Sequence, residues 1–286
     1  DLLQRQGRHP APPGWPPDIP GLEIAGEVVE ASGGSGAWRS GDRVFGIVGG
    51  GGNAEYVVTH AAGLAGIPDS MSWEDAAAVP EAFITAHDAL VTQAALRRGE
   101  RMLVHAAGSG VGLAATQLAR ALGGTCYGTT RTQDKIDRAR AFGLTDGLVV
   151  GDDPGIIATA ARRWTNDHGM DVILDLVGGP YLSVNVECAA PLGRIILIGL
   201  MAGRSATLNL GTILARRLTI RGTALRSRSD AEKAAATAAF ARDVLPLLER
   251  GAVRPVVDRV LPLDQIREAH ALLESNSTFG KVVLRH

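Results

Sequence analysis

The sequence has few cysteines, few aromatic residues and almost no net charge. Its 286 residues include two cysteines, Cys126 and Cys188, and no CxxC pair, which excludes a disulfide framework and a structural zinc knuckle. This cysteine usage favours a reducing compartment, so we expect a cytoplasmic protein. Lys and Arg total 29 against 30 Asp and Glu, and aromatic residues make up 4%. That composition provides no basic field for nucleic acid or an anionic membrane.

Long apolar runs are also missing. No stretch approaches the roughly 18 consecutive apolar residues of a membrane-spanning helix, and no charged-then-apolar leader opens the chain. The chain begins at Asp1 without a methionine and in mid-pattern, so we expect further residues to precede it. Small molecules are therefore the expected partners, with neither nucleic acid nor membrane among them.

The chain divides into three segments of different texture. Residues 1–83 combine Pro-rich and Gly-rich turns, such as "GGSGAWRSGDRV", with the β-prone runs "GEVVEA", "DRVFGIV" and "AEYVVT", which predicts a small, irregular β domain. Residues 84–222 alternate helical patterns with nearly all-apolar strands, which is typical of a parallel sheet covered by helices on both faces. Residues 223–286 contain an amphipathic helix at 230–250, the run "VVDRVLPL", a helix at 264–275 and the strand "KVVLR". The fold class is therefore α/β, with a doubly wound domain and a second, β-rich domain.

A glycine-rich segment, "HAAGSGVGLAA", follows a predicted strand and opens a predicted helix. Gly110, Gly112 and Ala115 fit the pattern G-x-G-x-x-G/A in the context that dinucleotide binding requires. A backbone without side chains can approach a pyrophosphate, whose charge meets free N–H groups at the helix start. A tight turn that binds no ligand is the alternative. The candidate cofactor residues here are Gly108, Ser109, Gly110, Val111 and Gly112, with the Ser109 hydroxyl as a possible further donor.

The end of the next strand distinguishes between cofactors. NAD enzymes usually place an acidic residue there, ~20 residues after the glycines, to bind the ribose 2′-hydroxyl. This strand instead ends in Thr130 and Arg131, and Lys135 follows, so a hydroxyl and two cations are available for a 2′-phosphate. NADPH is therefore favoured over NADH. Ordinary solvated charges are the alternative, and the neighbouring Asp134 weakens the case for the phosphate.

Several segments together resemble the medium-chain dehydrogenase/reductase superfamily: "PGLEIAGEVVE", "GDRVFGI", "NAEYVV", "AAAVPEAFITAHDAL" and "FGKVVL". The likeness is greatest to its zinc-free quinone oxidoreductase branch, which includes zeta-crystallin, and "VPEAF", "LDLVGG", "IGLMAG" and "ALRSR" look most like the p53-inducible members. The resemblance covers essentially the whole chain. It implies a GroES-like catalytic domain made from both chain ends, a central Rossmann domain that binds the cofactor, and an active-site cleft between them.

Zinc is not expected in this chain. Zinc-dependent relatives carry G-H-E where this sequence has Gly21, Leu22 and Glu23, and a leucine cannot bind a metal. A catalytic zinc needs about three N, S or O ligands, and none of the seven histidines lies at ligand spacing from another. Glu23 is expected to be a structural partner of the backbone.

The resemblance also implies where the remaining cofactor and substrate contacts lie. Thr85 matches a cofactor-facing threonine, although a hydroxyl bonded to its own helical turn is the alternative. His9 matches a tyrosine of the family's substrate cleft, and a solvated loop histidine is the alternative. Asn276 and Lys281 match the last contact region, where Lys281 could instead be an edge-strand charge. The segments expected along the nicotinamide half are Val177, Gly178, Gly199, Leu200 and Met201, and Leu200 is also a substrate-cleft candidate.

Hydride transfer without a metal suits electron-poor acceptors, so the leading hypothesis is an NADPH-dependent quinone oxidoreductase. An NADPH-dependent enoyl or enone reductase is the alternative within the same class. An NADPH-binding protein with incidental turnover is the alternative from another class.

Assembly is the last expectation. "GRIILIGL" and "LTIRGTAL" are apolar strands near the end of the α/β domain, and the second is predicted to be the last strand of the sheet. An exposed apolar edge is a template for pairing, and relatives join such edges across a two-fold axis. We expect a homodimer with an isologous contact near Leu218 to Ala224. An edge covered by its own loop, "LRSRSD", is the alternative.

Overall fold

The computed structural model describes residues 1–32 and 38–286, and the chain divides into two compact units. Residues 33–37, in the predicted turn "GGSGAWRSGDRV", lie outside the described residues. The first unit combines Asp1–Thr85 with Ala224–His286, and the second is Ala86–Thr223. The boundaries therefore fall after Thr85 and Thr223, where the sequence placed them after residues 83 and 222.

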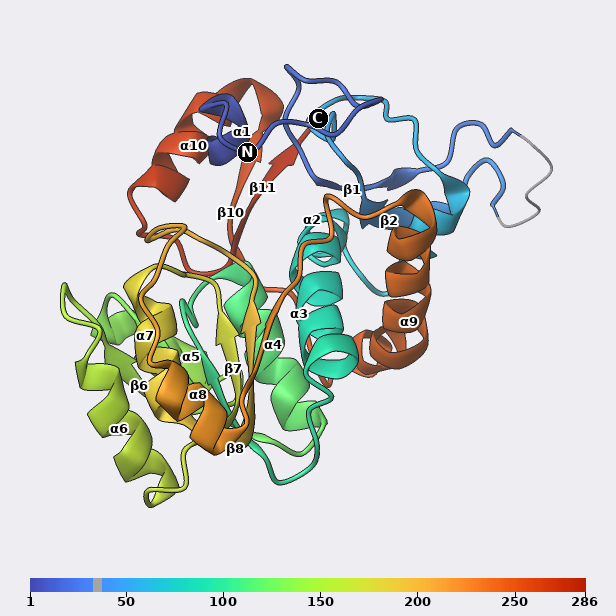
Figure 1. Cartoon of the computed structure of the whole chain (residues 1–286). Helices are drawn as coiled ribbons and strands as arrows, with labels where there is room; N and C mark the ends of the chain where they lie inside the picture. Colours follow the sequence, from blue (N-terminus) through green and yellow to red (C-terminus); the bar gives the residue numbers. More distant parts are fainter. Residues whose placement is uncertain (33–37) are drawn as a thin grey trace. The chain divides into compact units, whose positions relative to one another are not determined.

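The second unit is built on a parallel six-stranded sheet with the strand order β6-β5-β4-β7-β8-β9. Figure 1 labels β6, β7 and β8 of this sheet among the helices of the unit. Its strands are β4 Arg101–Val104, β5 Thr125–Thr130, β6 Leu144–Val149, β7 Met170–Asp175, β8 Ala189–Leu197 and β9 Thr219–Gly222. The order runs outward in both directions from the β4–β7 pair, so the predicted doubly wound sheet is confirmed. β9 forms one edge, as the sequence predicts.

Helices cover this sheet. They are α4 Gly110–Ala121, α5 Gln133–Arg140, α6 Ile156–Thr165, α7 Pro180–Cys188 and α8 Leu210–Arg216. Right-handed crossovers place α4 and α5 on one face of the sheet and α6 to α8 on the other. On the second face, a buried cluster that includes Ile157, Ile173 and Val184 packs helices against the sheet. α8 was not predicted from the sequence. Its Leu210 and Leu214 are 73% and 80% exposed, so the helix has no buried apolar face that the sequence pattern would reveal.

The first unit holds an antiparallel sheet of β1 Glu23–Glu27, β2 Arg43–Ile47 and β3 Leu64–Gly66, and a parallel pair of β10 Val257–Pro262 and β11 Lys281–Arg285. Its helices include α1 Leu2–Arg5, α2 Trp73–Ala77, α9 Asp230–Glu249 and α10 Ile266–Glu274, with 3-10 turns η1 Ala61–Gly63 and η4 Leu263–Gln265. Ser229 and Glu232 form a capping box that starts α9. Phe45 and Phe240 meet edge to face at 6.0 Å between ring centroids, which packs α9 on β2.

The predicted strand "AEYVVT" at residues 54–59 is wrong. The segment is irregular, and Tyr56 and Val58 are 77% and 93% exposed. Its β-branched and aromatic residues favour an extended backbone, but a strand also needs a hydrogen-bonded neighbour, and no named strand in the described part of the chain pairs with it.

A helical stretch crosses the boundary between the units. It consists of the π-helical segment η2 Pro80–Ile84, α3 Thr85–His87 and the π-helical segment η3 Asp88–Gln93. π-helical turns are rare and occur frequently at functional sites. This stretch contains Thr85, one of the predicted cofactor residues.

Candidate functional site

Most of the predicted cofactor residues lie in or beside the loops that follow four parallel strands, at one end of the six-stranded sheet, while Thr85, Asn276 and Lys281 belong to the other unit. These strands are β4, β5, β7 and β8, and the carboxyl ends of parallel strands share one edge. Ligands of open α/β sheets bind outside these ends, at the point where the strand order reverses. We call the segments after the four strands the strand-end loops.

The glycine turn after β4 opens α4 as a helix N-terminus. Ser109 is the N-cap, and its Oγ accepts a hydrogen bond from the Gly112 N–H at 3.1 Å. The hydroxyl is therefore engaged as an acceptor, and its own proton stays available to a ligand. The N–H groups of Gly110 and Val111, in the first turn, have no intrahelical acceptor. Such a helix start carries positive partial charge suited to a phosphate.

Gly112 allows two backbone segments of this turn to pack closely together. A Cβ built on Gly112 would contact the Ala106 carbonyl oxygen and lie 2.9 Å from Ala107 Cα, so the start of α4 packs directly on the chain that leaves β4. The left-handed conformation in the turn falls at Ala106, with φ of 52°, and not at a glycine. Gly108 is buried in the turn.

The end of β5 presents fewer outward donors than the sequence predicts. The Thr130 hydroxyl donates to the Thr132 carbonyl at 2.7 Å, so in this conformation it closes the turn into α5 and offers no proton to a ligand. Arg131 is exposed, and Lys135 is half-buried in the first turn of α5. Asp134 pairs with Arg138 at 3.5 Å, which directs that carboxylate along its own helix.

The loops after β7 and β8 lie against each other. Gly178 and Gly203 form a parallel β-bridge, and the Ala202 N–H donates to the Val177 carbonyl at 2.8 Å. Gly178 has φ of 68°, and a Cβ there would lie 2.8 Å from the Leu200 side chain. Leu200 and Met201 are 47% and 66% exposed, so their side chains are accessible to a ligand. The structure thus brings the predicted nicotinamide-side residues together.

Sequence reasoning missed a buried polar cluster beneath these loops. It contains Thr129, His105, Asn185 and Asp175, and each side chain is hydrogen-bonded to the next. Burial lowers the pKa of His105, although the nearby Asp175 acts in the opposite direction. The available signal was the placement of His105 and Asp175 at the ends of otherwise apolar strands.

Tyr181 was also missed. Its ring meets His105 edge to face at 4.9 Å between centroids, at the start of α7. Burial raises the pKa of Tyr181, while Arg131 acts to lower it, so the phenol lies within the electrostatic reach of the cation after β5.

Thr85 is the only predicted cofactor residue among those described whose buried side-chain oxygen lacks a hydrogen-bond partner. It is 7% exposed, and its Oγ1 is unpartnered. The alternative of a hydroxyl bonded to its own helical turn is therefore wrong. A buried hydroxyl without a partner costs about 1–3 kcal/mol, and that cost would be removed by a ligand that supplies the missing bond.

Lys281 is paired within its own unit. Its Nζ contacts the Glu23 carboxylate, whose other oxygen accepts the Glu81 N–H at 2.9 Å. Burial acts to lower the pKa of Lys281, but the Glu23 and Glu81 carboxylates together outweigh it and the net shift is upward. The expectation that Glu23 is a partner of the backbone is therefore confirmed, and Lys281 is more than an edge-strand charge.

Glu81 gives the first unit a pH-dependent stability. Burial, followed by the neighbouring Glu23 carboxylate, raises the pKa of Glu81 to about 7. A carboxyl whose pKa is raised on folding stabilises the protein fully below its unfolded pKa, and this contribution is lost as the pH rises through the folded value. We therefore expect Glu81→Gln to unfold at a higher temperature than wild type at pH 8, and at nearly the same temperature at pH 4.5, in thermal melts across this range. Parallel curves for the two proteins would contradict this.

His9 and Asn276 occupy exposed positions. The His9 carbonyl accepts from Arg226 Nη1 at 2.8 Å, so a buried arginine anchors the loop that carries this exposed residue. Asn276 has a left-handed φ of 55° after α10, and its side chain donates to the Glu274 carbonyl at 3.1 Å.

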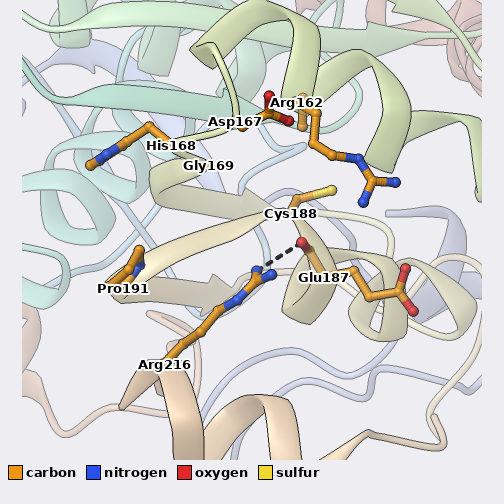
Figure 2. Close-up of a pocket in the computed structure, with 9 residues that line it drawn as sticks. Arg162, Asp167, His168, Gly169, Glu187, Cys188, Pro191 and Arg216 are labelled. Carbon is orange, nitrogen blue, oxygen red and sulfur yellow. Dashed lines mark hydrogen bonds between the residues drawn. The ribbon is translucent and has the colours of Figure 1, made fainter.

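A cavity of about 330 Å³ lies at the opposite end of the sheet from the strand-end loops. His168 and Gly169 line it just before β7 begins, and Cys188 lies just before β8. Figure 2 shows Arg162 and Arg216 around Cys188, with Arg216 bonded to the Glu187 carbonyl. Burial raises the pKa of Cys188 to about 12, so the thiol is protonated at neutral pH. The predicted cofactor residues do not line this cavity.

No group of three or more His, Cys, Asp or Glu side chains that could hold a metal ion occurs among residues 1–32 and 38–286. In the same part of the chain, no helix is both long and apolar enough to cross a membrane.

Comparison with known proteins identifies the family. Residues 1–69 match the alcohol dehydrogenase GroES-like domain, and residues 152–284 match the zinc-binding dehydrogenase family. The quinone oxidoreductase of Lama guanicoe is 30% identical over 286 residues, which cover 99% of this chain and 84% of that protein. The chain belongs to the medium-chain dehydrogenase/reductase superfamily, as an oxidoreductase related to the quinone oxidoreductases.

Other relatives are much longer proteins or have been solved as structures. The polyketide synthase GfsB of Streptomyces halstedii is 34% identical over 284 residues, and this chain spans 5% of its length. A mycobacterial protein solved in complex with NADPH is similar with a TM-score of 0.88 and 27% identity, covering 100% of this chain and 88% of that one. The JamJ enoyl reductase is similar with a TM-score of 0.82 and 26% identity, covering 93% and 79%.

Proposed function

We propose that the protein is an NADPH-dependent reductase that transfers hydride to quinones without a zinc ion. The cofactor assignment rests on two features that occur together. The helix α4 begins in a glycine-rich turn, and β5 is followed by an exposed arginine, Arg131, in place of a carboxylate. Phosphates of the cofactor would lie at the α4 N-terminus, and a 2′-phosphate would lie against Arg131 and Lys135.

The residues present fit the cofactor. The unpartnered Thr85 hydroxyl can bond a polar group of the ligand, and the exposed Leu200 and Met201 can cover an apolar ring face. The bound nicotinamide supplies the hydride. The protein's task is to orient the ring, exclude water and hold the acceptor against it.

The quinone assignment is supported by the quinone oxidoreductase relatives and by Leu22, which removes the histidine that zinc-dependent members use. Without a Lewis acid, the acceptor itself must stabilise the charge that develops on hydride transfer. Quinones do so through both carbonyls. An α,β-unsaturated thioester does so less strongly, and the similarity to polyketide synthases and to an enoyl reductase supports this second candidate.

A panel of acceptors tests the proposal. Full-length protein with NADPH is expected to reduce 1,4-benzoquinone with a higher kcat/KM than crotonyl thioester. The reverse order would replace the quinone by an enoyl substrate. Tight NADPH binding without turnover of either acceptor would leave a binding protein and contradict the reductase.

Thr85→Val should separate cofactor binding from stability. Valine is nearly isosteric with threonine and removes a hydroxyl that is buried without a partner, so the free protein should be at least as stable as wild type in a thermal melt. NADPH affinity should fall about tenfold, because the lost hydrogen bond exists only in the complex. Thr85→Ser keeps the hydroxyl and should bind NADPH nearly as wild type does. Unchanged affinity of Thr85→Val would remove Thr85 from the cofactor site.

We also propose that the protein is a homodimer through the β9 edge. Thr219, Arg221 and Gly222 are exposed along this strand, and Leu210 and Leu214 of the same unit add exposed apolar surface. Pairing of β9 with its two-fold copy would extend the sheet. Sedimentation at micromolar concentration should give twice the chain mass of 29.8 kDa. Ile220→Pro, which removes a backbone donor, should give monomers, and a dimer that persists would place the interface elsewhere.

A further inference from the structure

Four buried side chains form one continuous chain of hydrogen bonds beneath the strand-end loops. Thr129 Oγ1 lies 2.9 Å from His105 Nδ1, and His105 Nε2 lies 2.7 Å from Asn185 Oδ1. Asn185 Nδ2 donates to Asp175 Oδ2 at 2.9 Å. The other oxygen, Asp175 Oδ1, accepts the N–H groups of Val177 and Gly178, each at 2.8 Å. His105, Asn185 and Asp175 are fully buried, and Thr129 is 2% exposed.

The hydrogen-bond pattern assigns the donor and acceptor atoms of these four side chains. Asp175 accepts three hydrogen bonds, two at Oδ1 and one at Oδ2, which is the pattern of an ionised carboxylate. The Asn185 amide must therefore point its NH₂ group at Asp175 and its oxygen at His105, so His105 carries its proton on Nε2. Burial lowers the pKa of His105 and so favours the neutral ring, in which Nδ1 accepts from the Thr129 hydroxyl.

The two ends of this hydrogen-bond network lie in different parts of the proposed cofactor site. Thr129 lies in β5, next to Thr130 and Arg131, and His105 precedes the glycine turn. Asp175 ends β7 and fixes the backbone of Val177 and Gly178, which in turn bridge to the loop after β8. One polar chain thus joins the loops proposed for the adenosine, pyrophosphate and nicotinamide parts.

We infer that Thr129, His105, Asn185 and Asp175 are positioning residues that hold the Val177–Gly178 loop in the conformation that receives the nicotinamide half of the cofactor. This inference rests on the proposed function. Without this hydrogen-bond network, the Val177–Gly178 loop would lose the carboxylate that orders its N–H groups. The nicotinamide half would then have to bind a mobile segment.

A cofactor fragment distinguishes this role from general stability. The fragment 2′,5′-ADP carries the adenosine and the 2′-phosphate but no nicotinamide, so its affinity does not depend on the Val177–Gly178 loop. We expect Asn185→Leu to raise the Kd of NADPH about tenfold while the Kd of 2′,5′-ADP stays within about twofold, in titrations of the full-length protein. Equal weakening of both ligands, or no weakening of either, would overturn the inference.

A milder pair of variants keeps the test decisive if Asn185→Leu fails to fold. Thr129→Val removes the donor to His105, so NADPH affinity should fall while 2′,5′-ADP affinity stays nearly unchanged. Thr129→Ser restores the donor, so NADPH affinity should recover. Thr165→Val is the matched control. Thr165 is also 2% exposed, and its hydroxyl donates to the Ala161 carbonyl at 2.7 Å, at the end of α6 and outside the polar chain.

The control should lower the thermal midpoint as Thr129→Val does but leave the NADPH Kd unchanged. Equal NADPH affinities for Thr129→Val and Thr165→Val would overturn the inference and leave the proposed function intact. A wild-type protein that binds neither NADPH nor 2′,5′-ADP would overturn both.

Discussion

Gly112→Val is expected to abolish NADPH binding at concentrations that saturate the wild-type protein. A side chain at this position would contact the Ala106 carbonyl oxygen and would approach Ala107 Cα to 2.9 Å, so the start of α4 must move away from β4. That movement displaces the Gly110 and Val111 N–H groups from the place proposed for the pyrophosphate. Charge-assisted hydrogen bonds are worth roughly 1.5–3 kcal/mol each, so losing two lowers the affinity by more than about a hundredfold.

Gly26→Val is the matched control for this substitution. Gly26 lies in β1, and a Cβ there would meet nothing within 4 Å. Calorimetric titration should therefore give a wild-type Kd for Gly26→Val and no measurable binding for Gly112→Val. Wild-type NADPH affinity in a folded Gly112→Val protein would mean that the α4 N-terminus does not hold the phosphates.

The double variant Arg131→Ala, Lys135→Ala is expected to weaken NADPH binding and leave NADH binding nearly unchanged. Only NADPH carries the 2′-phosphate, and Arg131 is exposed at the tip of β5 with Lys135 one helical turn away in α5. Each charge-assisted contact to a phosphate contributes roughly 1.5–3 kcal/mol, so loss of one alone lowers NADPH affinity about ten- to a hundredfold.

A control variant in α5 tests whether the position of the removed cations matters. Arg138→Ala, Arg140→Ala also removes two cations, but from the last turn of α5, where they pair with Asp134 and Asp146. This variant should retain the preference for NADPH. Equal weakening of NADPH and NADH by Arg131→Ala, Lys135→Ala would show that the two cations do not bind the 2′-phosphate.

The α/β domain could be predicted from the sequence because its strands are buried on both faces. Segments such as "RMLV" and "MDVILD" are largely apolar runs between helical patterns, and they form the central strands β4 and β7. The β-rich unit was predicted less well. "AEYVVT" has the composition of a strand, but pairing depends on a distant segment of the chain, and composition carries no information on that partner.

The candidate site shows the same division. The glycine turn and the cationic end of β5 are local patterns and were visible in the sequence. The link from His105 to Asn185 joins residues 80 positions apart, and the pairing of Lys281 with Glu23 joins opposite ends of the chain. Thr130 was assigned to the cofactor from its position, and only its bond to the Thr132 carbonyl shows that the hydroxyl closes a turn.

The measurement that tests the account most directly is the steady-state oxidation of NADPH and of NADH by the full-length protein, with 1,4-benzoquinone as acceptor. The account predicts turnover with NADPH and a kcat/KM for NADH that is lower by about tenfold or more, the free-energy equivalent of one phosphate contact. Equal kcat/KM values for the two cofactors would contradict the assignment of the 2′-phosphate site. No turnover with either cofactor would contradict the proposed reductase.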